Sequence, residues 1–235
     1  MRDLDGRVVA IAGAAGGLGP VVARELAHRG ATLALGERDP ERLKTVVTDL
    51  GLPTERIAGT ALDLLSLDAG REWAEAIAER FGKVDALVHL VGGWRGGKGI
   101  GEAPVEDDDF LHDLLVRSVQ LASRAFLPQL KESGGRFMIV SSPQADGPSA
   151  DNAAYGASKA AAEAWTLALA DELGEHGGAA NIIRVNAIAT PQMRAENPEK
   201  EYKTFTDADE IAAVIGYLLS DAARKMNGQR LSLHP

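Results

Sequence analysis

A tyrosine and a lysine stand four residues apart in the run YGASK, at Tyr155 and Lys159, where an alanine-rich segment begins. Alanine is the strongest helix former, so the segment predicts a helix with both side chains on one face, one turn apart. A phenol with an ordinary pKa of about 10 is a poor acid or base near neutral pH, but a neighbouring ammonium favours its ionised form. The pair could transfer protons beneath a bound cofactor; without one, both are ordinary helix residues.

A second cluster with chemical meaning is the run AGAAGGLG, which contains Gly13, Gly17 and Gly19 and follows the apolar run RVVAIAG. Glycines let the backbone approach a pyrophosphate, whose charge is offset by N–H groups at the start of the next helix. Pro20 is compatible with the first turn of that helix. A tight turn without a ligand is the alternative, but a place at the first strand-to-helix connection favours dinucleotide binding.

Charged residues at the expected ends of the second and third strands bear on the nucleotide. Glu37 can accept hydrogen bonds from an adenosine ribose, whereas Arg38 can pair with a 2′-phosphate. The cofactor is therefore predicted to be NAD or NADP, with a slight preference for NAD. Asp63 could accept a hydrogen bond from the adenine amino group, although capping a helix is its commoner use.

Short apolar runs alternate with amphipathic segments along all 235 residues. Helices are expected over residues 18–28, 42–50, 68–81, 106–130, the YGASK segment and the run DADEIAAVIGYLLS; strands are expected at RVVAIAG, ATLALGE, GTALDLL, VDALVHLVGG, GRFMIVSS, IIRVNAIA and QRLSLH. Apolar runs rather than strict alternation indicate strands covered on both faces. The predicted fold class is α/β: one domain over residues 1–235, with a doubly wound parallel sheet (Rossmann fold) flanked by helices on both faces.

Composition restricts the function classes. The net charge of −9 argues against nucleic-acid binding, which needs clustered Lys and Arg. The chain has no cysteine, and its five histidines lack a spacing suited to zinc, so no metal is predicted. No apolar run is long enough for a membrane span or a signal-peptide core, so a cytoplasmic protein acting on a small molecule is expected.

Taken together, these motifs resemble the short-chain dehydrogenase/reductase family of the classical type, from Gly13 to about Gly228. Ser142 ends the fifth expected strand and precedes Tyr155 by 13 residues, as in that family. The resemblance implies an NAD(P)-dependent oxidoreductase that moves a hydride between the nicotinamide and a carbonyl or secondary alcohol. It further implies that Tyr155 exchanges a proton with the substrate oxygen, that Ser142 steadies that oxygen, and that Lys159 holds the nicotinamide ribose.

The resemblance also gives a complete set of expected site residues. The catalytic set is Ser118, Ser142, Tyr155 and Lys159; the cofactor-binding set is Gly13, Gly17, Leu18, Gly19, Glu37, Arg38, Asp63, Leu64, Gly92, Tyr155, Lys159 and Thr190.

The chain departs from the family pattern at several positions. Ser118 stands where the family usually has an asparagine that organises a relay water, and the run His89-Leu90-Val91-Gly92 replaces Asn-Asn-Ala-Gly. We expect His89 to be an interior histidine with its hydrogen bonds satisfied rather than a catalyst. The substrate lid after Asn186 looks shortened, and the C-terminus lacks the family's acidic Gly-Gly tail.

The departures keep other functions open. A nucleotide-binding sensor or scaffold with decayed chemistry is one alternative, and a dehydratase or isomerase on the same scaffold is another. The family commonly pairs its long helices across a two-fold axis, so a homodimer or homotetramer is expected.

Two polar, glycine-rich or proline-broken loops, at residues 92–102 and 190–205, follow strand ends and should flank one cleft. The first loop carries Trp94, Arg95 and Lys98, which we expect to form a wall over the substrate, the two cations pairing with a carboxylate or phosphate. A solvated flexible loop is the alternative.

Overall fold

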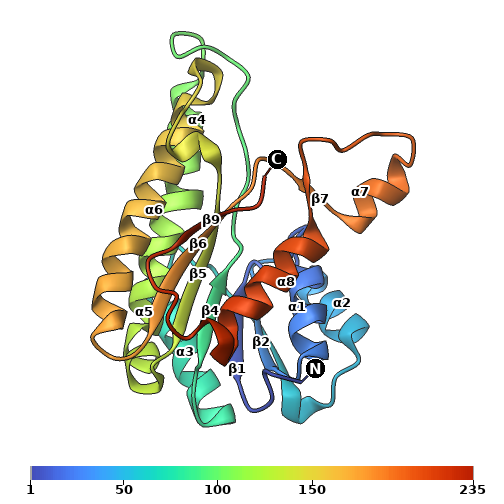
Figure 1. Ribbon diagram of the computed structural model, residues 1–235, viewed down its shortest axis with the longest axis vertical. Coiled ribbons are helices and arrows are strands. Elements are labelled where there is room, and N and C mark those ends of the chain that lie inside the picture. Colours follow the sequence, from blue (N-terminus) through green and yellow to red (C-terminus); the bar gives the residue numbers. More distant parts are fainter. Residues whose placement is uncertain (1, 235) are drawn as a thin grey trace.

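The structure is a computed structural model that describes residues 2–234. Within that range seven parallel strands form one sheet in the order β3-β2-β1-β4-β5-β6-β9 (Figure 1). The strands are β1 (Val8–Ala12), β2 (Thr32–Glu37), β3 (Ile57–Ala61), β4 (Ala86–His89), β5 (Arg136–Ser141), β6 (Ala179–Arg184) and β9 (Arg230–Ser232). This is the predicted doubly wound parallel sheet, and the strand order reverses between β1 and β4.

Helices cover both faces of the sheet, as predicted. One apolar core lies under α1 (Gly19–His28), α2 (Pro40–Leu50) and α8 (Ala208–Leu219), and the other lies under α3 (Leu67–Phe81), α5 (Ser118–Ser133) and α6 (Ala153–Gly174). Successive residues of β1 alternate between the two cores, so the strand is buried on both sides. This double burial explains its continuous apolar run.

Local signals fix where the helices begin and end. The carboxylate of Asp39 accepts hydrogen bonds from the backbone N–H groups of Glu41 and Arg42, and Pro40 occupies the first turn of α2. Gly51 ends that helix with a φ of 58°, in the left-handed region that glycine adopts most easily. The start of α2 is therefore held firmly beside the end of β2.

Several elements differ from the sequence prediction. The strand β6 covers Ala179–Arg184, whereas the predicted run IIRVNAIA spans residues 182–189. The strand β3 begins at Ile57, ahead of the predicted run, and the long helix expected over residues 106–130 is divided. It consists of α4 (Val105–His112), a π-helical turn over Asp113–Arg117, and α5. A π turn inserts one extra residue into a helix and often occurs at functional sites, and a pattern with a period of 3.6 residues does not reveal it.

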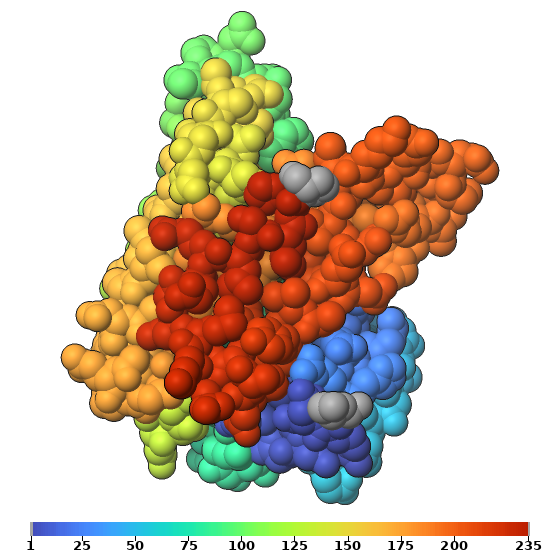
Figure 2. Space-filling view, viewed as in Figure 1, coloured from blue at the N-terminus to red at the C-terminus, as the bar shows by residue number. Residues whose placement is uncertain are grey.

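Connections at the carboxyl edge of the sheet form the walls of the candidate site. The loop after β4 rises beside α4, and the segment containing β7 (Ile188–Ala189), α7 (Pro191–Glu196) and β8 (Thr206–Asp207) projects from the body near the same end (Figures 1 and 2). Thr190 caps α7 by accepting a hydrogen bond from the Met193 N–H at 3.2 Å. In this fold class ligands bind outside the carboxyl ends of the strands, at the reversal of strand order.

Candidate active site

The glycine loop after β1 depends on its glycines for different reasons. Gly13 has a φ of 78°, and a Cβ there would lie 2.9 Å from the backbone nitrogen of Val91. A Cβ on Gly19 would lie 2.3 Å from the carbonyl oxygen of Ala14, so α1 can start close to the loop only with glycine at this position. Gly17 is less crowded: its virtual Cβ would meet only the Thr190 methyl, at 3.4 Å. Gly13 and Gly19 shape the loop, and Gly17 borders an open cleft.

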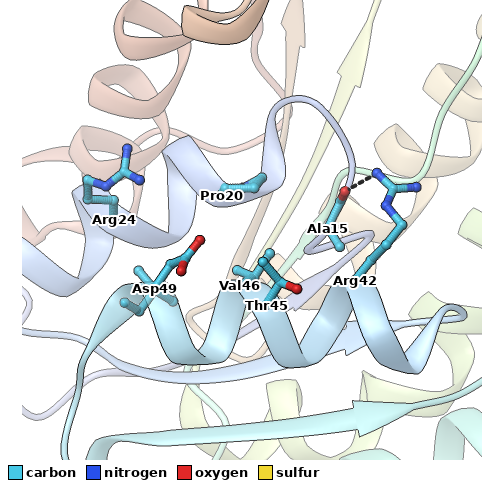
Figure 3. A pocket seen from close by; sticks show the side chains of 8 residues that line it. Ala15, Pro20, Arg24, Arg42, Thr45, Val46 and Asp49 are labelled. Carbon is cyan, nitrogen blue, oxygen red and sulfur yellow. Dashed lines mark hydrogen bonds between the residues drawn. The ribbon is translucent and has the colours of Figure 1, made fainter.

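Glu37 braces this loop. Its carboxylate accepts hydrogen bonds from the backbone N–H of Ala15 at 3.1 Å and of Arg38 at 2.9 Å. The Arg42 guanidinium reaches back from α2 and donates to the carbonyl oxygen of Ala15, beside a small pocket between α1 and α2 (Figure 3). One acidic and one basic side chain therefore fix the two hydrogen-bonding groups of Ala15.

A cavity of about 420 Å³ lies on the β2 side of the loop. Among the predicted residues it is lined by Gly13, Glu37, Arg38, Asp63, Leu64, Gly92 and Ser118. Asp63 accepts a hydrogen bond from the Leu65 N–H at 2.9 Å, and Ser66 caps α3, so Asp63 forms a turn rather than the helix cap. The cavity has the lining expected for the adenosine half of a dinucleotide.

A larger cavity of about 620 Å³ adjoins the first and contains the predicted catalytic residues. Its predicted lining residues are Gly17, Leu18, Gly92, Ser142, Tyr155, Lys159 and Thr190. The two cavities share several lining residues, including Gly16 and the segment from Leu90 to Trp94. The structure thus brings the predicted residues together along one cleft, except Gly19, which is buried, and Ser118, which lines only the adenosine side.

Burial changes the pKa values of the tyrosine and lysine. It raises the pKa of Tyr155, against a smaller opposite effect of its hydrogen bond with Ser142. It lowers the pKa of Lys159 to about 8, while the negative charge of Glu163 acts in the opposite direction. The expected lowering of the Tyr155 pKa by Lys159 is not found. The Lys159 Nζ lies 5.7 Å from the centre of the Tyr155 ring and donates to the carbonyl oxygen of Val140 at 2.8 Å.

The Ser142 side chain is buried, and its hydroxyl oxygen already takes part in one hydrogen bond. Its Oγ accepts a hydrogen bond from the Gln144 N–H at 3.3 Å, at the start of a short 3-10 turn over Pro143–Ala145. Because the backbone donor occupies an acceptor position, the hydroxyl hydrogen is free to donate toward Tyr155 or a nearby oxygen. The Ser142 hydroxyl is therefore available as a hydrogen-bond donor.

His89 and Ser118 meet the prediction in part. His89, the last residue of β4, is 2% exposed, as expected of an interior histidine. Its hydrogen bonds are not all satisfied, however, because the Nε2 atom has no partner among residues 2–234. Burial and the charge of Lys159 lower the pKa of His89 to about 4, so the imidazole is neutral at pH 7. The Ser118 hydroxyl donates to the carbonyl oxygen of Leu114 at 2.6 Å, within its own helix.

The loop after β4 does not place Trp94, Arg95 and Lys98 together in one wall over the substrate, as was predicted. The Trp94 indole N–H donates to Asn152 Oδ1 at 2.7 Å, just before α6, and both residues line the cavity that holds Tyr155. Arg95 instead pairs with Asp107 at 2.7 Å and stacks 3.6 Å from the Phe110 ring centre. Lys98 lines a separate surface pocket. The two loops do flank one cleft, but only Trp94 faces the catalytic side.

Several residues that line the cleft were not predicted from the sequence, and the polar ones among them include Arg42, Gln144 and Asn152, the partner of Trp94. The sequence did contain an indication for Arg42, because this residue lies four positions after Arg38, at the start of a helix that faces the glycine loop. Asn152 and Gln144 belong to turns, whose side-chain directions depend on tertiary contacts.

Two kinds of feature are absent from the described part of the chain. No helix between residues 2 and 234 is long and apolar enough to cross a membrane. The same residues contain no group of three or more His, Cys, Asp or Glu side chains arranged to hold a metal ion.

Comparison with known proteins assigns the family. The model of the short chain dehydrogenase family matches residues 7–204. The chain is 30% identical to D-threitol dehydrogenase of Mycolicibacterium smegmatis, with 97% of this chain and 91% of that protein covered. It is 32% identical to an uncharacterized oxidoreductase of Mycobacterium tuberculosis, over 96% of this chain and 88% of the relative.

A solved structure agrees with these relatives. A short chain dehydrogenase from Burkholderia cenocepacia, in complex with NADP, superposes with a TM-score of 0.84 at 30% identity, covering 98% of this chain and 97% of that one. The matched family, the oxidoreductase relatives and the cleft at the reversal of strand order agree with one another. The chain belongs to the short-chain dehydrogenase family and is an NAD(P)-dependent oxidoreductase.

Proposed function

We propose that the protein interconverts a carbonyl compound and a secondary alcohol, with Tyr155 as the acid and base. The observation that carries this proposal is that Ser142, Tyr155 and Lys159 line one cavity together with Gly17 and Thr190. Bound nicotinamide would supply or accept the hydride, so the protein has to position the substrate and move one proton.

Each polar group has a distinct part in this mechanism. During reduction Ser142 donates its hydroxyl hydrogen to the substrate oxygen, and Tyr155 gives that oxygen its phenolic proton as negative charge develops. The ammonium of Lys159 stabilises the resulting phenolate, and its pKa of about 8 keeps it mostly protonated at pH 7. In the oxidation direction Tyr155 takes the proton back.

The cofactor-binding residues are assigned by the same proposal. Gly17 and Leu18 would approach the pyrophosphate at the start of α1, and Lys159 and Thr190 would hold the nicotinamide end. Asp63, Leu64 and Gly92 would surround the adenosine end, where Glu37 favours NAD by accepting from a ribose hydroxyl. Arg38 and Arg42 line the same cavity, so the carboxylate of Glu37 is the group that disfavours a 2′-phosphate.

The proposed substrate is a small, neutral, oxygen-bearing molecule. Beside Tyr155 the cavity presents the amides of Gln144 and Asn152 and the ring of Trp94, with no carboxylate side chain among the described residues that line it. Gln144 Oε1 accepts from the Ser149 N–H at 3.0 Å, which leaves the amide nitrogen to donate to a second substrate oxygen. The similarity to a D-threitol dehydrogenase supports a hydroxylated substrate of this kind.

We also propose that the protein assembles as a homodimer or homotetramer. The outer face of α6 carries a stripe of exposed alanines, at Ala157, Ala161, Ala164 and Ala168. Small side chains on one helix face allow a second helix to pack closely, and a two-fold axis through this face would pair α6 with its copy.

A panel assay tests the proposed reaction. Purified protein is mixed with NADH or NADPH carrying deuterium at the transferred position, and with small hydroxyketones, diketones, aldehydes and simple ketones. The proposal expects deuterium on the former carbonyl carbon of at least one hydroxylated product. Cofactor binding without transfer to any carbonyl compound, and without oxidation of the matching alcohols, would instead favour the sensor or non-redox alternatives.

A further inference from the structure

The buried imidazole of His89 has one ring nitrogen without a protein partner. Nε2 is fully buried and has no hydrogen bond to any atom of residues 2–234, although the residue lines the cavity that holds Tyr155 and Lys159. A buried polar atom left without a partner destabilises the folded state, because it gives up its hydrogen bonds to water without replacing them. Most such atoms in proteins bond to an ordered water when no protein group is available.

Strand register brings Lys159 close to this nitrogen. His89 is paired with Ile139 on the neighbouring strand β5, and the Lys159 ammonium donates to the carbonyl of the next residue, Val140, at 2.8 Å. His89 and the Lys159 ammonium therefore lie at the same end of the adjacent strands β4 and β5, and both residues line the same cavity. An ammonium has three hydrogens to donate, and the structure gives one of them to Val140.

The groups around this point favour a neutral imidazole as an acceptor. The register partners of His89 are Ala12 and Ile139, neither of which can ionise. The ionisable groups in the first half of α6, over residues 153–163, are Tyr155, Lys159 and Glu163, whereas Asp171 and Glu172 lie near its C-terminal end. The backbone of Ser118 also acts on the imidazole, and Asp113 lines the adjoining cavity. Lys159 is the only cation among the groups named here.

We propose that His89 and Lys159 hold a buried water between them, and that His89 acts through this water as a positioning residue for the Lys159 ammonium. The water accepts a hydrogen from Nζ and donates one to Nε2, which satisfies the unpartnered nitrogen. This arrangement stabilises the charged form of Lys159, so it opposes the loss of charge that burial favours. The inference deepens the proposed function, because Lys159 acts there on Tyr155.

The first test measures the Lys159 titration directly, without substrate. Protein with ¹³C-labelled lysine is titrated by NMR, and the Lys159 signal is assigned by its loss in Lys159→Arg. In His89→Leu, which cannot bond to the water, we expect the midpoint to fall from about 8 by about one pH unit. In His89→Gln, whose amide can bond to the water, the midpoint should return toward the wild-type value. An unchanged midpoint in His89→Leu overturns the inference.

Catalysis provides the second readout. The alkaline limb of the kcat profile for carbonyl reduction should move down with the Lys159 midpoint in His89→Leu, which lowers kcat at pH 8 by about fivefold. His176→Leu, at an exposed turn, is the matched control and should leave both profiles unchanged. A fall in kcat at every pH without a shift of the limb would indicate a packing defect and contradict the inference.

A measurement on the unchanged protein covers the case in which His89→Leu does not fold. In protein with ¹⁵N-labelled histidine, Nε2 of His89 should give the signal of an unprotonated, hydrogen-bonded nitrogen throughout pH 6–9, with the signal assigned by its absence in His89→Gln. A signal typical of a nitrogen without a hydrogen bond overturns the inference. Full activity of Tyr155→Phe would refute the proposed function instead, and would leave both NMR results intact.

Discussion

Individual residues of the cleft divide into those that shape the backbone and those that are free to contact a ligand. The family resemblance was sufficient to predict that Ser142, Tyr155 and Lys159 lie at one site, and the structure places them in one cavity because one strand and one helix fix their relative positions. The direction of the Tyr155 pKa shift was not predictable, since it depends on burial that only the packed structure supplies. Asn152 was not predicted as a residue of the cleft, because its hydrogen bond with Trp94 joins two positions that lie 58 residues apart in the chain.

The glycine loop gives a matched pair of substitutions. Gly19→Ala places a methyl against the Ala14 carbonyl, so we expect the free energy of unfolding to fall by about 1–3 kcal/mol. Gly17→Ala meets only the Thr190 methyl at an ordinary φ and should keep its stability. It should weaken NADH binding about tenfold, because the methyl projects into the cleft. Denaturant unfolding and fluorescence titration check both; unaltered NADH affinity in Gly17→Ala would argue against a pyrophosphate at this position.

Glu37 provides a test of cofactor choice. Glu37→Gln removes the negative charge and retains an oxygen that can accept from the Ala15 N–H. With Arg38 and Arg42 lining the same cavity, we expect NADPH to bind at least about tenfold more tightly, and NADH to change less. Competitive titration of the two reduced cofactors gives the ratio. A wild-type protein that already prefers NADPH strongly would show that the arginines outweigh Glu37.

Among the elements, the strands followed closely from their apolar runs, whereas the division of the helix before β5 did not. The π turn over Asp113–Arg117 depends on how α4 and α5 pack against α6, and residue type alone carries no signal for it. A charge network around the buried pair of Arg184 and Glu163 is a second feature beyond sequence patterns. Arg184 at the end of β6 joins Glu163 of α6 to Asp146 in the turn after Ser142, and Arg230 of β9 also bonds to Glu163 at 2.7 Å.

This network predicts a pH-dependent loss of stability. Burial tends to raise the pKa of Glu163, but hydrogen bonds from Arg184 and Arg230 outweigh it and hold the pKa below its ordinary value of 4.5. A lowered carboxyl pKa stabilises the folded state above pH 4.5, and this stability is lost as the pH falls through the folded value. Glu163→Gln should therefore lose about 3 kcal/mol at pH 7, because Arg184 is left buried without its main partner.

Urea unfolding at a series of pH values measures this effect. The difference between Glu163→Gln and the wild type should shrink below pH 4.5, where Glu163 itself becomes neutral. Asp146→Asn is a useful control because Asp146 is exposed, so it should cost far less. A difference that stays constant from pH 7 to pH 3 would contradict an electrostatic origin.

For the whole molecule, the parallel sheet, its two helical layers and the site at the carboxyl edge all followed from the alternation of segments and the position of the glycine loop. The sequence did not reveal how the segment after β6 is arranged. Its small strand pair β7–β8 and the hydrogen bond from the Tyr202 hydroxyl to the Met193 carbonyl are contacts within the segment itself, without a periodic pattern.

The oligomeric state of the protein can be measured in solution. We expect the wild type to elute as a dimer or tetramer in size-exclusion chromatography with light scattering at micromolar concentration. Ala161→Glu places a charge in the middle of the exposed alanine stripe on α6, and it should reduce the measured mass to that of the monomer. Ala78→Glu is the comparison variant: it places the same charge on α3, at a half-buried position outside the α6 stripe. A wild type that is monomeric throughout would exclude this interface.

In the proposed mechanism Tyr155 transfers the proton, while the cofactor site functions independently of that residue. The most direct measurement compares wild type and Tyr155→Phe in a single-turnover assay, with the best carbonyl substrate and saturating reduced cofactor, alongside cofactor affinity from fluorescence titration. Because the ring remains and the proton does not, we expect the rate to fall by at least about a thousandfold while the Kd for the cofactor changes less than about threefold. A phenylalanine variant that reduces the substrate at the wild-type rate would contradict the account.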